Sequence, residues 1–225
     1  MSWPHTTAVR GEQEAMSEFA DVVRNRRMTR SFSTRPVDPT VLDSLVDLAA
    51  RSPSAGKTQG WHLVVLEGAD TARYWDITLP VARRAGFRWT RLLDAPLLLL
   101  VLADPDAYVA RYGEPDKAAT GLGASADAWP APYWTIDASM AAMTLLHAAE
   151  DAGLGALFFG VFQREDAVRA ALAVPDRLQM IGAIALGYPH QDEPGGGAPG
   201  RPDTSGRSAA RRRRPPAEII HRGGW

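Results

Sequence analysis

The sequence contains no cysteine, and this absence excludes several kinds of chemistry at once. Disulfide bonds, thiolate metal sites, iron–sulfur clusters and cysteine nucleophiles all require a thiol. Lysine is scarce as well: Lys57 and Lys117 are the two lysines, so 23 of the 25 basic residues are arginine. The five histidines form no pair at the i, i+4 spacing of a helical zinc site, so we expect no metal.

Long hydrophobic runs are also lacking. The longest, residues 95–103, has nine residues including Pro96, far short of the roughly 20 apolar residues that cross a bilayer. The first residues, Met1-Ser-Trp-Pro-His5, do not form the basic and apolar regions of a signal peptide. We therefore expect a cytoplasmic protein with no membrane partner.

The chain has the composition of a folded domain, with 225 residues of which 45% are hydrophobic and 23% charged. By composition we expect a flexible arm over 1–16, a domain over 17–190, a Gly/Pro-rich linker over 191–209 and a C-terminal arm over 210–225. Helices are predicted from Ser17, from Pro39 to Ser52, and over 71–86, 137–151 and 164–173; strands are predicted over 61–66, 95–103, 155–162 and 180–186. Helices and strands mix without strict alternation, so the expected class is α+β.

Arginine is unevenly distributed, although the formal net charge is only −1. Five arginines lie between Arg24 and Arg35 with no acid among them, and five more lie between Arg207 and Arg214. Three interpretations are open: an anion-binding site, a solvated basic face, or a weak nucleic-acid tail. The arginines are not interleaved with aromatic residues and the domain is not basic overall, so nucleic acid is not the expected partner.

Residues for acid–base or nucleophilic catalysis are few. Ser52, Ser54 and Thr58 have no base nearby in the sequence. The Gly153-Leu-Gly155 segment lacks the full spacing of a dinucleotide fingerprint and follows a predicted helix instead of a strand. An enzyme of this composition is expected to take its chemistry from an organic cofactor.

Four segments together resemble the flavin-dependent nitroreductase family, whose members are FMN-dependent NAD(P)H oxidoreductases. These are Arg26-Arg-Met-Thr-Arg-Ser-Phe32 with Pro36-Val37, Ser52-Pro-Ser-Ala-Gly-Lys-Thr-Gln-Gly-Trp61, Gly153-Leu-Gly-Ala-Leu-Phe-Phe-Gly-Val-Phe162, and Ile184-Ala-Leu-Gly-Tyr-Pro189 with Arg212-x-Arg214-x-Pro216-x-Glu218. Each motif alone is weak, but the four in this order are specific. The resemblance implies a nitroreductase-like fold, a central mixed sheet wrapped by helices, and a homodimer with an extended C-terminal arm and FMN at the subunit interface.

The resemblance also implies which residues bind FMN. It implies that the 5′-phosphate is bound by Arg26, Arg27, Arg30, Arg212 and Arg214, with Met28 contributing its backbone. Arg211 and Arg213 have no family counterpart. Pro53, Ser54, Ala55 and Gln59 reach the flavin of the partner subunit, and Phe158, Phe159, Gly160 and Val161 line the isoalloxazine, with the Gly160 N–H near N5. Arg91 is the candidate for stabilising negative charge at N1 and C2=O of the reduced flavin.

The sequence departs from the family pattern at three positions. Met28 replaces a serine, Lys57 an asparagine and Gly60 a proline. Lys57 either donates to the flavin or its ribityl chain and favours the reduced state, or points to solvent. Because a lysine cannot accept a hydrogen bond, flavin affinity and potential are open at this position.

Residues 104–135 are rich in Gly, Pro and Ala and are expected to form a long loop, which in a compact domain is usually a lid or binding loop. Trp129, Tyr133 and Trp134 near its end either form a stacking lid over the flavin or belong to the core or dimer interface.

The activity implied by the resemblance is a ping-pong exchange that needs no side-chain acid or base. NAD(P)H delivers hydride to flavin N5 and leaves, and an electron-poor acceptor of nitroaromatic or quinone type then takes its place. Two alternatives remain: a flavin-dependent dehydrogenase or oxidase of a biosynthetic intermediate, and a protein that sequesters flavin without catalysis. The sequence does not select the acceptor, NADH or NADPH, or a deazaflavin.

Overall fold

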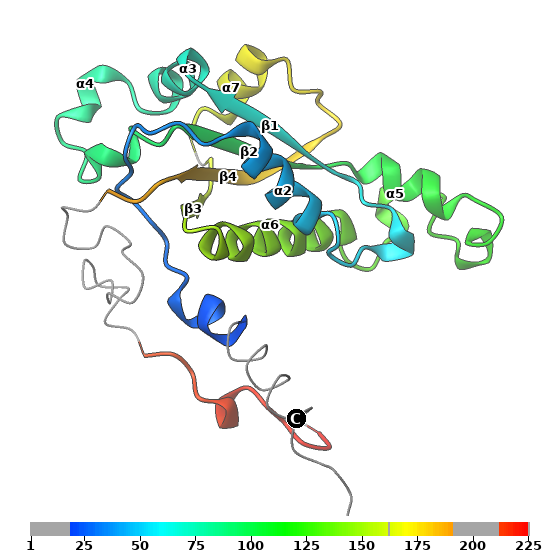
Figure 1. Cartoon of the computed structure of the whole chain (residues 1–225). Helices are drawn as coiled ribbons and strands as arrows, with labels where there is room; N and C mark the ends of the chain where they lie inside the picture. Colours follow the sequence, from blue (N-terminus) through cyan, green and yellow to red (C-terminus); the bar gives the residue numbers. More distant parts are fainter. Residues whose placement is uncertain (1–18, 162, 191–211, 225) are drawn as a thin grey trace, which may run out of the picture.

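The computed structural model describes residues 19–161, 163–190 and 212–224 (Figure 1). The expected N-terminal arm over 1–16 and the linker over 191–209 lie outside these residues. The described residues form four strands, β1 Trp61–Glu67, β2 Leu97–Ala103, β3 Gly155–Phe159 and β4 Gln179–Gly187, which make one sheet of order β1-β2-β4-β3. The helices are residues 19–25, α2 Pro39–Ala49, α3 Ala69–Thr78, α4 Val81–Arg84, α5 Pro105–Tyr112, α6 Tyr133–Asp151 and α7 Glu165–Leu172, with 3₁₀ turns η1 Ala55–Lys57, η2 Thr90–Leu92, η3 Ala118–Thr120, η4 Ala126–Ala128 and η5 Pro216–Glu218.

Strand β2 is the centre of the core because all seven of its residues are buried. Leu97, Leu99 and Val101 pack with apolar residues of α2 and α6 on one face of the sheet. Leu98 and Leu100 pack with residues of α3 and α7 on the other face. Figure 1 shows these helices as two layers on either side of the sheet. Burial of each leucine contributes about 1.5–3 kcal/mol, so this apolar run fixes the layered α+β architecture.

The expected mixed sheet needs one correction. All three strand pairings are antiparallel, and the parallel pairing is confined to an isolated bridge between Met28 and Ala156. The continuous apolar run of β2 reflects helices on both faces, as expected, and this cover arises here without parallel strands.

Helix and loop boundaries differ from the prediction where proline or capping chemistry acts. The helix expected over 71–86 is two helices, because Pro80 disfavours helical geometry at Leu79, whose φ and ψ are −135° and 78°. The expected loop over 104–135 contains α5, which Asp104 caps by accepting hydrogen bonds from the N–H groups of Asp106 and Ala107.

Helix α6 begins at Tyr133, four residues earlier than expected, so Asp137 lies inside it and does not cap it. Strand β3 ends at Phe159, before the predicted end at residue 162. None of the helices in the described part of the chain has the length and apolar character of a membrane span.

The arginine-rich segment after the first helix runs beside β3. The Thr29 N–H donates to the Ala156 carbonyl at 2.9 Å, next to the Met28–Ala156 bridge. The close approach requires glycine at position 155, because a Cβ added there would lie 2.6 Å from Thr29 Oγ1. The first and third motifs of the sequence are therefore neighbours in space.

This contact predicts that Gly155→Ala destabilises the protein by about 1–3 kcal/mol, since the methyl group overpacks a buried junction. Gly86→Ala is the matched control, because no heavy atom lies within 4 Å of an added Cβ at Gly86. We expect the control to be neutral or slightly stabilising, by about 0.4–1 kcal/mol. Denaturant unfolding of the two variants measures the difference, and equal stability would show that the Thr29 contact is not restrictive.

Candidate functional site

A cavity of about 470 Å³ lies at the end of β3, between this strand and the α3–α4 region. The cavity is lined by five of the residues that the sequence predicts to bind flavin, namely Arg30, Phe158, Phe159, Gly160 and Val161. Trp75 of α3 stacks on Phe159 with the ring centroids 6.0 Å apart and the planes 9° from parallel. The Arg30 guanidinium lies 5.4 Å from the centre of the Trp89 ring. The cavity is thus aromatic, with a cation at its wall.

Arg26 is half-buried, like Arg27 and Arg30 of the same N-terminal cluster. Its Nη1 atom is buried and has no hydrogen-bond partner in the described part of the chain. Burial lowers the pKa of Arg26, and the nearby positive charges of Arg27 and Arg213 lower it further, whereas Glu150 raises it. Such a crowded, unsatisfied cation favours a bound anion.

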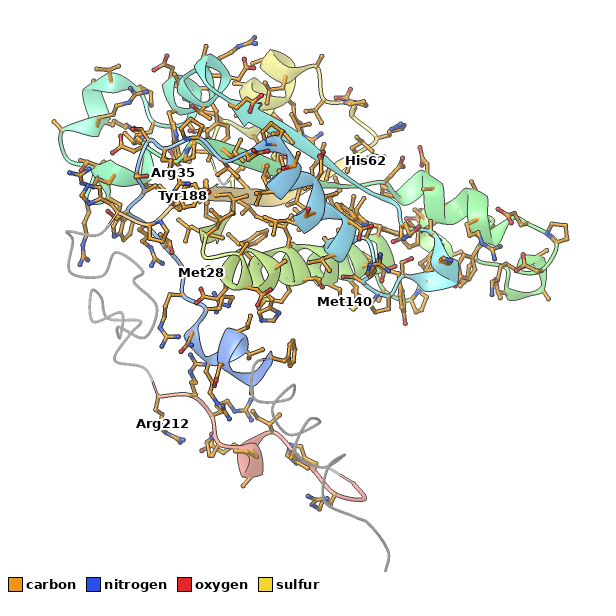
Figure 2. The ribbon with its side chains drawn as sticks, in the orientation of Figure 1. Met28, Arg35, His62, Met140, Tyr188 and Arg212 are labelled. Atoms are coloured by element: carbon orange, nitrogen blue, oxygen red, sulfur yellow. The ribbon has the colours of Figure 1, made fainter. Side chains whose placement is uncertain are left out.

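The two arginine clusters approach each other through a residue without a family counterpart. The charge of Arg213 acts on Arg26, whereas Arg212 Nη2 donates to Glu218 Oε1 at 2.6 Å and Arg214 donates to the Glu218 backbone carbonyl. Figure 2 shows Arg212 on the C-terminal segment, below the sheet and α6. Arg213 therefore lies close enough to Arg26 for their charges to interact, while Arg212 and Arg214 pair with Glu218.

The other arginines that are predicted to bind FMN pair with groups close to them in the chain. Arg27 donates to the backbone carbonyls of Arg24 and Arg26, and Arg30 donates to that of Met28. Arg91 lies in η2, where its carbonyl accepts from the Phe32 N–H at 3.1 Å and its side chain lies 3.8 Å from Asp94. Trp89 and Leu92 line the cavity, and Arg91 itself is not among its lining residues.

The segment from Ser52 to Gly60 forms a compact loop at the opposite end of the sheet, beside α5. Ser52 Oγ lies 2.7 Å from Thr144 Oγ1 of α6, and the Gln59 N–H donates to Ser54 Oγ at 3.0 Å. The Gln59 side chain donates to the Ala50 carbonyl, so it is used within the loop. The predicted residues Pro53, Lys57 and Gln59 are exposed, and Ser54 and Ala55 are half-buried.

Two family departures in this loop have local physical consequences. A Cβ at Gly60 would lie 2.7 Å from the Tyr108 ring, so the proline of the family pattern does not fit here. Lys57 has φ of +57°, a left-handed conformation that asparagine tolerates better than lysine.

Asp137 is a residue of this region that sequence reasoning missed as part of a site. It is 2% exposed, and its Oδ2 accepts hydrogen bonds from the Ala55 N–H and the Tyr108 hydroxyl, each at 2.8 Å. The signal was available as a carboxylate on a helix of small and apolar residues, but the expected helix start at Asp137 assigned it to capping.

The three aromatic residues proposed as a lid belong to a cluster around α5. Trp129 lies 4.6 Å from the Tyr112 ring and 5.8 Å from the Tyr108 ring, and its Nε1 donates to the Leu122 carbonyl. Trp134 Nε1 donates to Gln179 Oε1 at 2.8 Å, and Tyr133 is half in solvent. None of the three lines the cavity at β3, so the lid role stays a prediction and the core interpretation describes their contacts within one chain.

The predicted site residues therefore fall into two groups within one chain. The cavity group, with Arg30 and Phe158–Val161, lies toward α3 and α4, and the Ser52–Gly60 loop lies toward α5. Figure 1 shows α4 and α5 at opposite ends of the sheet. Among the described residues no three His, Asp or Glu side chains stand together as a metal site would require.

Comparison with known proteins identifies the relatives of this arrangement. The chain is 28% identical over 207 residues to the 4-nitrobenzoate reductase of Nocardioides sp., covering 80% of this chain and 84% of that protein. It is 28% identical over 185 residues to the NADH dehydrogenase of Thermus thermophilus, covering 74% and 84%. The crystal structure of a nitroreductase family protein from Streptococcus pneumoniae shares the fold, with a TM-score of 0.64 at 22% identity over 90% of this chain and 98% of that one.

The strongest comparison is with the family as a whole. The model of the Nitroreductase family matches residues 23–188, which include the N-terminal arginine segment, the Ser52–Gly60 loop, the β3 cavity and the last strand. The chain therefore belongs to the nitroreductase family.

Proposed function

We propose that this chain is an FMN-dependent oxidoreductase that passes hydride from NAD(P)H to an electron-poor acceptor of nitroaromatic or quinone type. The two substrates use one site in turn, in a ping-pong sequence. Family membership supports flavin-dependent oxidoreduction of NAD(P)H, and the relatives named for 4-nitrobenzoate and NADH support these substrate classes. The acceptor, the cofactor FMN and the dimer described below are part of the proposal.

The observation that carries the proposal is the unsatisfied guanidinium of Arg26. Its buried Nη1 has no partner among the described residues, and Arg27 and Arg213 add positive charge beside it. A phosphate group supplies oxygens that accept from such donors, and each charge-assisted bond contributes about 1.5–3 kcal/mol. Arg212 and Arg214 join this phosphate site in the proposal, exchanging their pairing with Glu218 for the phosphate.

The volume of about 470 Å³ and the lining residues of the β3 cavity suit a flavin ring. Phe158, Phe159, Gly160 and Val161 give one apolar wall, and the backbone N–H of Gly160 is the proposed donor near N5. Arg30, which the family resemblance assigns to the 5′-phosphate, lies at the cavity wall, so in this proposal it supplies positive charge to the ring side of the flavin. Arg91 of η2, which does not line the cavity within one chain, remains the candidate for the pyrimidine edge. When bound, FMN supplies the chemistry by accepting and releasing hydride at N5. The chain itself orients the ring, excludes water and stabilises negative charge.

A second copy of the chain completes the proposed site. Ile136, Met140 and Met143 follow one stripe of α6, and Ile136 and Met143 are 40% and 37% exposed. Figure 2 shows Met140 on the face of α6 that points away from the sheet. An exposed apolar stripe on a helix suits a two-fold interface, across which Pro53, Ser54, Ala55, Lys57 and Gln59 of one copy reach the flavin of the other.

The alternative of a flavin-sequestering protein loses part of its basis in the structure. The features that favour it are the departures from the family pattern at Lys57 and Gly60, and the Tyr108 ring accounts for glycine at position 60 by packing alone. No described residue favours a dehydrogenase of a biosynthetic intermediate over the proposed activity.

The proposal predicts that the purified full-length chain binds FMN and is yellow. Under anaerobic conditions, addition of NADH or NADPH should bleach the flavin absorbance, and addition of a nitroaromatic or quinone should restore it. Stopped-flow absorbance measures both half-reactions. A chain that takes up no added FMN would contradict the proposal.

The phosphate site predicts that Arg26→Ala weakens FMN binding by roughly 10–100-fold, the loss of one charge-assisted contact. Riboflavin, which lacks the phosphate, should bind both proteins equally. Arg24→Ala is the matched control, since Arg24 is exposed and lies 3.2 Å from Asp21. Flavin fluorescence titration gives the affinities, and an equal loss for riboflavin would place Arg26 away from the phosphate.

A further inference from the structure

The Ser52–Gly60 loop holds three left-handed backbone positions within four residues, and two of them are strained because they carry side chains. Gly56, Lys57 and Gln59 have φ of +60°, +57° and +53°, and two of these residues are not glycine. A non-glycine residue in the left-handed region is strained, so such a conformation persists only when its surroundings fix it. The neighbours of this loop are therefore what keeps it in this conformation.

Two side chains from other segments hold the loop from opposite sides. Asp137 Oδ2 accepts from the Ala55 N–H at 2.8 Å, and Arg111 Nε donates to the Gly56 carbonyl at 3.0 Å. Arg111 is itself fixed by Asp116, to which its two terminal nitrogens donate at 2.7 and 2.8 Å. An acceptor thus binds the N–H side of the strained turn and a donor binds its carbonyl side.

Of the two side chains that hold the loop, Asp137 is the buried one, and it accepts a second hydrogen bond from Tyr108. The Tyr108 hydroxyl donates to the same Oδ2 at 2.8 Å, and the Tyr108 ring packs against Gly60 at the end of the loop. Burial raises the pKa of Tyr108, and the adjacent Asp137 raises it further, so the hydroxyl remains a donor. One carboxylate therefore joins the loop, α5 and α6.

We propose that Asp137 is a positioning residue that holds the Ser52–Gly60 loop in its flavin-binding conformation before flavin or a second copy of the chain binds. The loop then presents the Ser54–Lys57 backbone and side chains to the flavin of the partner subunit without an ordering cost. This consequence for flavin rests on the proposed function, whereas the fixed loop is a property of the chain alone.

The test measures the rigidity of the loop and the affinity for FMN in four variants of the full-length chain. Asp137→Ala removes the acceptor, Asp137→Asn retains an oxygen, Tyr108→Phe keeps the Ala55 bond, and Asp151→Ala makes the same change at an exposed position of α6. Amide hydrogen exchange of residues 52–60 reports the loop without flavin, and titration with FMN reports affinity.

We expect Asp137→Ala to speed exchange across the loop and weaken FMN binding by about tenfold each, the scale of one buried hydrogen bond. Asp137→Asn should restore most of both properties. Tyr108→Phe should lower the melting temperature yet leave loop exchange near that of the unmodified chain, as should Asp151→Ala.

The proposal is overturned if Asp137→Ala leaves loop exchange and FMN affinity unchanged, or if Tyr108→Phe speeds loop exchange equally, which would indicate general loosening. If Asp137→Ala does not fold, Asp137→Leu replaces it in the same exchange measurement: faster exchange of residues 52–60 than in Tyr108→Phe supports the proposal, and exchange no faster than in Tyr108→Phe contradicts it. If Asp137→Ala speeds loop exchange but neither the unmodified chain nor any variant binds FMN, the result would support the role of Asp137 in fixing the loop and contradict the proposed function.

Discussion

The burial of β2 on both faces is the constraint on which the rest of the structure depends. Helices α2 and α6 cover β2 on one face of the sheet, and α3 and α7 cover it on the other, so the centre of the sheet is closed to a ligand. The polar and strained segments are therefore found where strands end: the cavity group at the end of β3, and the Ser52–Gly60 loop just before β1. The proposed two-chain site would bring these ends together, and it would cover the exposed apolar stripe of α6.

Much of the fold was predictable because local chemistry determined it. The Pro39–Ala49 helix follows from the Asp38 cap and its apolar spacing, and β1 and β2 lie within one or two residues of the predicted ends. Helix α5 was missed because residues 104–135 as a whole are rich in Gly, Pro and Ala, although Asp104-Pro105 is a cap followed by a first-turn proline. The four family motifs indicated the family, and the family match confirmed it.

The candidate site was less predictable because its key contacts join residues distant in the chain. Ala55 and Asp137 are 82 positions apart, and Arg26 meets the charge of Arg213 from the opposite end of the sequence. No periodicity or motif reports such pairs, since they depend on how α6 and the C-terminal arm pack. The net charge of −1 illustrates the same point, because a sum over the chain conceals two positive clusters, of which Arg26 and Arg213 lie close enough to interact.

The central claim is that one flavin site takes its arginines from one chain and its Ser52–Gly60 loop from another, and mixed dimers test it directly. One chain would carry Arg26→Ala, and the other Gly56→Val, which places a branched side chain at φ of +60° and 2.9 Å from the Tyr112 ring. With separate affinity tags, the purified mixed dimer should bind about one FMN per two chains, while each variant alone binds FMN poorly. A mixed dimer without flavin would contradict a site shared between chains, because a site within one chain is damaged in both variants.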